Sequence, residues 1–151
     1  MATKRRIALV TGSNRGLGFE TCSQLARLGL TVILTARDIT KGKVASKRLS
    51  DKGLDETFYK LDVSEESHIN RIANQVESQF GRIDVLVNNA AILYDTWQNA
   101  VNADFDTVNQ SFRTNLFGPW RLTQKCIPIM KTQIWTHSKC VERCRFVTFH
   151  D

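Results

Sequence analysis

The sequence predicts an α/β domain built as a doubly wound parallel sheet. Short apolar runs rich in β-branched residues alternate with segments of helical periodicity, and glycine ends several of the helical segments. This alternation favours parallel strands joined by right-handed crossover helices, which places helices on both faces of the sheet. A chain of 151 residues has room for one domain with a substantial core.

The first half of the chain supplies two pairs of strand and helix. A strand is expected over about residues 5–11, followed by a helix over 17–28 that ends at Gly29. Residues 31–36 are apolar and β-branched, which predicts a second buried strand. Residues 39–49 are predicted to form a basic surface helix.

The alternation continues through a third and a fourth strand, over residues 57–61 and 83–87. The helix between them is the clearest in the chain and is expected to start at Ser64 and to end at Gly81. Apolar residues recur along it at helical spacing, namely Ile69, Ile72, Ala73, Val76 and Phe80.

One long helix and a tail are expected in the last third. Residues 101–131 are predicted to be helical with an interruption at Gly118-Pro119, and residues 145–149 allow a short fifth strand. We therefore divide the chain into an incomplete α/β domain over 1–131 and a divergent tail over 132–151. The sheet is then truncated after about the fourth or fifth strand.

A glycine-rich turn follows the first strand and opens the first helix. Gly12 permits a tight turn, Gly16 lets the main chain approach a ligand, and Gly18 lets the helix pack close to the strand. Free N–H groups at the start of a helix favour anionic oxygens, so the turn is suited to the diphosphate of a nucleotide cofactor. The alternative is an ordinary turn with incidental glycines. The candidate cofactor-binding residues here are Gly12, Ser13, Asn14, Arg15, Gly16, Leu17 and Gly18.

The end of the second strand indicates which dinucleotide is bound. This position faces the adenosine ribose in a dinucleotide-binding fold, and it carries Arg37, while Arg15 lies in the glycine turn. Guanidinium groups suit a 2′-phosphate, so NADP(H) is expected in preference to NAD(H). The alternative for the two arginines is a solvated surface pair. Asp38 is open to two interpretations, a ribose ligand or the N-cap of the next helix, and the cap is favoured.

Four motifs in order resemble those of the short-chain dehydrogenase/reductase family, which has a Rossmann-like doubly wound parallel sheet. They are Thr11-Gly12-Ser13-Asn14-Arg15-Gly16-Leu17-Gly18, Leu61-Asp62-Val63, Asn88-Asn89-Ala90-Ala91 and Thr114-Asn115. Ala91 departs from the usual glycine. Residues 34–42 are similar in particular to NADPH-dependent carbonyl reductases. The resemblance covers about residues 5–131.

The resemblance implies a role for each motif. Asp62 and Val63 would bind adenine, with the Asp62 carboxylate accepting from the amino group, and Asn89 and Ala90 would also contact the cofactor. Asn88 would be structural. Asn115 is the candidate catalytic residue, since in the family this asparagine holds a helix distortion and a water of the proton relay. Taken singly, Asp62 could instead cap a helix, Asn88 could form a turn, and Asn115 could be a polar surface residue.

The family's chemistry also needs a serine and a Tyr-x-x-x-Lys pair, because a phenol is a weak acid or base near neutral pH without a neighbouring cation. The tyrosines here are Tyr59 and Tyr94, followed at the fourth position by Val63 and Gln98. The family implies hydride transfer between a nicotinamide and a small carbonyl or alcohol substrate, yet the isolated chain is expected to be inactive. The alternative is a non-catalytic nucleotide-binding or partner-modulating form. Self-association through the helix over 101–131 is expected, because in similar proteins this helix joins a subunit interface.

Charge and composition exclude other classes. The net charge of +6 is scattered along the chain, so no nucleic-acid partner is expected. Neither a membrane span nor a secretory signal is found, which predicts a cytoplasmic protein with reduced cysteines. The tail offers four possible zinc ligands, but their spacing fits no strong pattern, and no metal is expected. They are His137, Cys140, Cys144 and His150.

Overall fold

A parallel β-sheet with helices on both faces organises the chain. The structure, a computed structural model, describes residues 5–93, 99, 101–130 and 146–147. The sheet has the order β3-β2-β1-β4-β5, and each pairing is parallel, as predicted. The strands are β1 (Ile7–Val10), β2 (Thr31–Ala36), β3 (Glu56–Lys60), β4 (Val85–Val87) and the two-residue β5 (Phe146–Val147).

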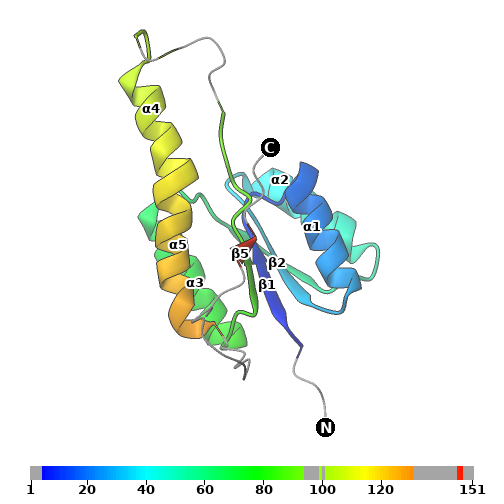
Figure 1. Cartoon of the computed structure of the whole chain (residues 1–151). Coiled ribbons are helices and arrows are strands. Elements are labelled where there is room, and N and C mark those ends of the chain that lie inside the picture. Colours follow the sequence, from blue (N-terminus) through cyan, green and yellow to red (C-terminus); the bar gives the residue numbers. More distant parts are fainter. Residues whose placement is uncertain (1–4, 94–98, 100, 131–145, 148–151) are drawn as a thin grey trace, which may run out of the picture.

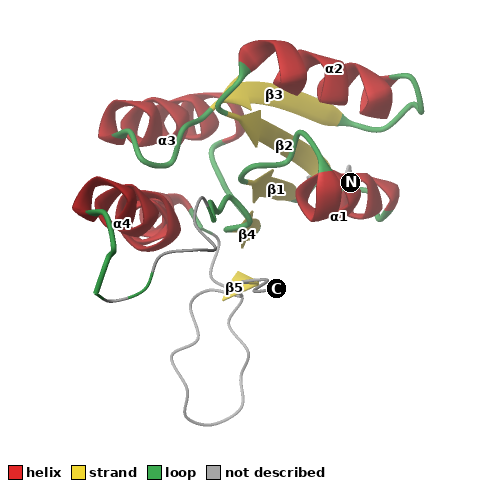
Figure 2. Cartoon of the chain, turned by 90° about the horizontal axis from the view of Figure 1, so that it is seen from above, coloured by secondary structure: helices red, strands yellow, loops and turns green. Residues whose placement is uncertain are grey.

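The helices form two layers around this sheet (Figures 1 and 2). Figure 2 shows α1 and α2 on one side of the sheet and α3 with α4 on the other. The helices are α1 (Gly16–Arg27), α2 (Ile39–Ser50), α3 (Glu66–Phe80), α4 (Phe105–Phe112), a π-helix (Arg113–Phe117), α5 (Gly118–Cys126) and a 3-10 turn (Ile127–Ile129). The α/β doubly wound fold class is therefore confirmed.

Alternation along the strands produces two separate cores. Ile7 and Leu9 of β1 face the layer of α3 and α5, whereas Ala8 and Val10 face the layer of α1 and α2. The buried Cys22 of α1 lies in the second core, where burial raises the pKa of its thiol to about 12. Both sheet faces are covered, which explains why β1 and β2 are continuous apolar runs.

The predicted boundaries up to β4 lie within two residues of those in the structure. The helix expected to start at Ser64 begins at Glu66, because the Ser64 side chain bonds back to Asp62 and Glu65 takes the N-cap position. Ile83, expected in the fourth strand, instead makes an isolated bridge to Met130.

The interruption of the long helix lies earlier than predicted. Residues Phe105–Cys126 form one continuous rod, and the irregular part is the π-helix Arg113–Phe117 (Figure 1). Gly118 and Pro119 do not break the rod, and Pro119, which has no N–H to donate, lies directly after the π-helix in the first turn of α5. The Gly118 N–H donates to the Arg113 carbonyl, five residues back, which is the π-helical pattern.

Candidate nucleotide-binding site

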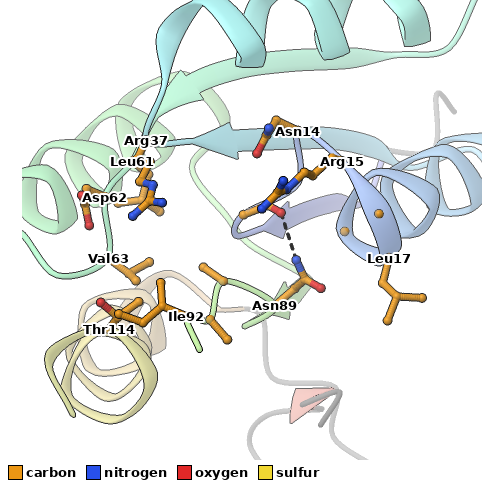
Figure 3. A pocket seen from close by; sticks show the side chains of 15 residues that line it. Asn14, Arg15, Leu17, Arg37, Leu61, Asp62, Val63, Asn89, Ile92 and Thr114 are labelled. Atoms are coloured by element: carbon orange, nitrogen blue, oxygen red, sulfur yellow. Dashed lines mark hydrogen bonds between the residues drawn. The ribbon is translucent and has the colours of Figure 1, made fainter. Parts of the chain in front are cut away.

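A cavity of about 450 Å³ opens at the carboxyl ends of the strands, where open α/β sheets bind ligands (Figure 3). It brings together three regions that are far apart in the sequence: the glycine turn after β1, the turn after β3 and the segment after β4. The lining residues are Gly12, Asn14, Arg15, Gly16, Leu17, Gly18, Arg37, Leu61, Asp62, Val63, Asn89, Ala90, Ala91, Ile92 and Thr114.

Two glycines of the turn are required by close packing. Gly12 has a positive φ of 60°, and a Cβ there would lie 2.8 Å from the Cα atom of Ala90. A Cβ at Gly18 would lie 2.4 Å from the side-chain nitrogen of Asn89 and 2.8 Å from the Gly12 carbonyl oxygen. Gly16 differs, because a Cβ there would meet no atom within 4 Å, so the space above it is open. The turn therefore packs against the segment after β4 and leaves its outer side accessible.

Asn89 fastens the glycine turn to β4. Its Nδ2 donates to the carbonyl oxygens of Thr11 at 2.9 Å and of Gly12 at 3.0 Å, and Figure 3 shows the side chain reaching toward the turn. In return the Thr11 hydroxyl oxygen accepts from the main-chain N–H groups of Asn89 and Ala90, both at 2.9 Å. Asn89 and Ala90 line the cavity as expected, and Asn89 also fixes the conformation of the turn.

Ser13 is the one predicted loop residue that does not line the cavity. Its side chain is fully buried, and its hydroxyl donates to the Val10 carbonyl at 2.9 Å and accepts from the Thr35 N–H, also at 2.9 Å. Ser13 thus joins the glycine turn to β1 and β2 from behind. Its buried side chain therefore points away from the cavity, and a contact of Ser13 with a cofactor stays a prediction.

Two guanidinium groups face the cavity from different elements. Arg15 comes from the glycine turn and Arg37 directly follows β2, and both side chains are exposed and directed toward the same space in Figure 3. The Asp38 carboxylate accepts from the Lys41 N–H at 3.0 Å and is the N-cap of α2. Of the two interpretations of Asp38, the cap is confirmed.

The turn after β3 carries the carboxylate of the site. Asp62 lines the cavity opposite the glycine turn, and its Oδ1 accepts from the Ser64 N–H at 3.0 Å and from the Ser64 hydroxyl at 2.7 Å. The main-chain N–H of Asp62 donates to Nδ1 of His68 at 3.2 Å. His68, which the sequence motifs did not single out, is half-buried and linked to the site by this bond. In the sequence, only its position in the first turn of the helix indicated that His68 could contact the turn after β3.

Asn88 and Asn115 support the site without lining the cavity. Asn88 donates to the Thr123 hydroxyl at 3.3 Å, which links the end of β4 to α5. Asn115 lies in the π-helix, where its Nδ2 donates to the Ile92 carbonyl at 2.8 Å and its Oδ1 accepts from the Ile92 N–H at 2.9 Å. The helix distortion that the resemblance implied at Asn115 is present.

Comparison with known proteins decides the family. The model of the short chain dehydrogenase family matches residues 6–137. The chain belongs to this family. It is 36% identical to a (+)-neomenthol dehydrogenase of Arabidopsis thaliana, over 83% of this chain and 49% of that protein. It is 34% identical to carbonyl reductase (NADPH) 1 of Sus scrofa, over 88% of this chain and 46% of that protein.

Solved structures of the family share the fold of this chain. A metagenomic short-chain oxidoreductase in complex with NADP superposes with a TM-score of 0.78 and 30% identity, covering 82% of this chain and 56% of that one. The chain spans about half the length of the curated relatives it matches.

The described part of the chain shows neither a metal cluster nor a membrane-spanning helix. No group of three or more histidine, cysteine or acidic residues there is arranged to hold a metal ion. The four tail residues considered as zinc ligands, His137, Cys140, Cys144 and His150, lie outside it. None of its helices is long and apolar enough to cross a bilayer.

Proposed function

We propose that this chain binds NADP(H) in preference to NAD(H), in the cavity at the carboxyl ends of β1, β2 and β3. The observation that carries the proposal is the combination of a packed glycine turn with Arg15 and Arg37 beside it and Asp62 opposite. These residues come from three parts of the chain, namely the glycine turn after β1, the end of β2 and the turn after β3.

Different residues of the site bind different parts of the dinucleotide. Main-chain N–H groups at the start of α1 hold the diphosphate, and the open side of Gly16 leaves room for it. Arg15 and Arg37 bind the 2′-phosphate, and Asp62 accepts from the adenine amino group. A bound nicotinamide would supply the chemistry of hydride transfer to or from a carbonyl or alcohol carbon. The sequence lacks the Tyr-x-x-x-Lys pair for the accompanying proton, so the 151-residue polypeptide by itself binds the cofactor without turnover.

Isothermal titration calorimetry of the folded chain with NADPH and NADH tests the proposal. We expect saturable binding of both, with NADPH bound more tightly. Absence of heat with either dinucleotide, on protein that circular dichroism shows to be folded, would overturn it.

Replacing Arg37 by alanine should weaken NADPH binding and leave NADH binding nearly unchanged. A hydrogen-bonded charge of this kind contributes about 1.5–3 kcal/mol, which corresponds to a loss of roughly 10- to 150-fold. Lys47→Ala on α2 is the matched control, because it removes the same charge from an exposed position that does not line the cavity. Equal losses for NADPH and NADH would assign Arg37 to a part of the site other than the 2′-phosphate.

A second candidate function, binding of a partner subunit, is favoured by exposed apolar side chains on the long helix. No residue of α4 is buried, and Phe105 is 85% exposed and Trp120 58% exposed. Exposed apolar patches of this kind favour association.

Light scattering should therefore find the chain self-associated. The double variant Phe105→Ser/Trp120→Ser is expected to shift the distribution toward monomer. Leu28→Ser, at a 71% exposed position next to α1, is the control and should not. A monodisperse wild-type monomer at high concentration would contradict this second function.

A further inference from the structure

The adenine side of the proposed site depends on one main-chain donor that leaves the sheet. The Leu61 N–H still donates to the Ala36 carbonyl at 3.0 Å and so extends the pairing of β3 with β2. The next N–H, that of Asp62, lies beyond the strand and has no sheet partner. It donates instead to Nδ1 of His68 at 3.2 Å. A half-buried N–H without an acceptor would be unfavourable, so this contact determines how the chain turns after β3.

The position of His68 on α3 suits this contact. The N-cap of α3 is Glu65, so His68 is the third residue of the helix. From this position a side-chain acceptor can reach back to a main-chain N–H that precedes the helix, as glutamate or glutamine does in a capping box. The bond reaches Asp62, beyond the N-cap. The Asp62 carbonyl is held as well, because it accepts from the Glu65 N–H at 3.1 Å. Both the main-chain N–H and the main-chain carbonyl of Asp62 are therefore held by hydrogen bonds.

The side chain of Asp62 is oriented in the same way. Ser64 donates twice to Oδ1, while Oδ2 has no hydrogen-bond partner among the described residues. One carboxylate oxygen is thus restrained by Ser64 in a residue that lines the cavity. His68 does not line this cavity, so any effect it has on a ligand must pass through Asp62.

We propose that His68 is a positioning residue for adenine recognition: by accepting from the Asp62 N–H, its Nδ1 holds the turn that presents the Asp62 carboxylate to the adenine amino group. The inference rests on the proposed function, since it concerns the adenine end of the same dinucleotide site.

Two variants and two ligands test this role. His68→Leu keeps most of the volume but removes the acceptor, whereas His68→Asn retains an acceptor at about the place of Nδ1. The ligands are NADPH and its analogue with hypoxanthine in place of adenine, which carries a carbonyl oxygen where adenine has the amino group.

We expect His68→Leu to weaken NADPH binding roughly three- to tenfold, in the range of one lost hydrogen bond, and His68→Asn to restore it within about twofold. Binding of the hypoxanthine analogue should be weaker in the wild type and insensitive to His68→Leu. Ser67→Leu, at the exposed neighbouring position, is the control and should leave both affinities unchanged.

Each outcome decides between adenine positioning and a general structural role. Equal losses for both ligands, or failure of His68→Asn to rescue, would overturn the proposal, as would unchanged NADPH binding by His68→Leu. If His68→Leu does not fold, the wild type still provides a test, because an N–H to N hydrogen bond gives a measurable nitrogen–nitrogen coupling in nuclear magnetic resonance. We expect that coupling between the Asp62 amide nitrogen and His68 Nδ1, and its absence would contradict the inference. If the wild type binds neither ligand, the proposed function itself fails, a result distinct from loss of adenine discrimination alone.

Discussion

A single methyl group at position 18 is expected to weaken NADPH binding and to destabilise the fold. In Gly18→Ala the new Cβ would lie 2.4 Å from Asn89 Nδ2, 2.8 Å from the Gly12 oxygen and 2.9 Å from the Ser13 Cα atom. The last two are main-chain atoms and cannot move aside as a flexible side chain would. The turn must shift, and the hydrogen bonds from Asn89 to Thr11 and Gly12 are then lost. Overpacking of this kind costs about 1–3 kcal/mol, and each lost hydrogen bond adds about 1 kcal/mol.

Urea denaturation and calorimetry measure the two effects of Gly18→Ala separately. We expect the free energy of unfolding to fall by roughly 3–5 kcal/mol and NADPH affinity to drop at least about tenfold. The control is Gly53→Ala, where φ is unfavourable for alanine, at 69°, but no atom lies within 4 Å of the new Cβ. This control should lose about 1 kcal/mol of stability and keep its NADPH affinity. Normal NADPH binding by Gly18→Ala would mean that the glycine turn does not hold the cofactor.

The second large effect concerns turnover. The 151-residue polypeptide should bind NADPH and yet oxidise it with an aromatic aldehyde no faster than the buffer does. General acid catalysis typically contributes about 10²–10⁴ in rate, and no phenol and ammonium are paired for it in this sequence. Tyr59 cannot substitute, because it packs against the core beside α3, its hydroxyl contacts Gln79, and it does not line the cavity. Burial also raises the pKa of Tyr59, which moves this phenol further from neutrality.

The measurement is NADPH absorbance at 340 nm, followed at about saturating cofactor with a catalytically competent family member as the positive control. Binding must be verified in the same sample, so that lack of turnover is not confused with an empty site. A rate within about tenfold of the competent enzyme would contradict the expectation and would require a proton donor that the described cavity does not contain.

The fold was predictable because its signals are local. The apolar run of β2, the amphipathic pattern of α3 and the glycines after the helices are each readable within a few residues. The cavity was predictable for the same reason, since the ends of parallel strands meet at one edge of the sheet. The inward position of Ser13 and the contact of His68 with Asp62 were not, because both depend on how neighbouring elements turn relative to one another. Composition contains no information of that kind.

The site of the helix irregularity illustrates the same difference. Gly118 and Pro119 are the residues that ordinarily signal a break, but the structure places the irregularity over Arg113–Phe117, where only the family resemblance at Asn115 indicated a distortion. Its cause is tertiary. A Cβ at Gly118 would lie 2.5 Å from the Val63 oxygen, so α5 begins in close contact with the turn after β3, and Asn115 is bonded to Ile92 on the other side.

The π-helix also determines how α4 is rotated about the helix axis relative to α5. A π turn contains one residue more than an α turn, so the faces of α4 and α5 are offset by about 100° from those of an uninterrupted α-helix. Leu122 and Cys126 of α5 point into the core, while α4 has no buried side chain. If a relative lost a single residue within Arg113–Phe117, its α4 would be rotated about the helix axis relative to α5. A different set of α4 side chains would then be exposed, while the packing of α5 against the core would be unchanged. Divergence of that surface between relatives can thus arise from a change in chain length alone, with no substitution on the surface itself.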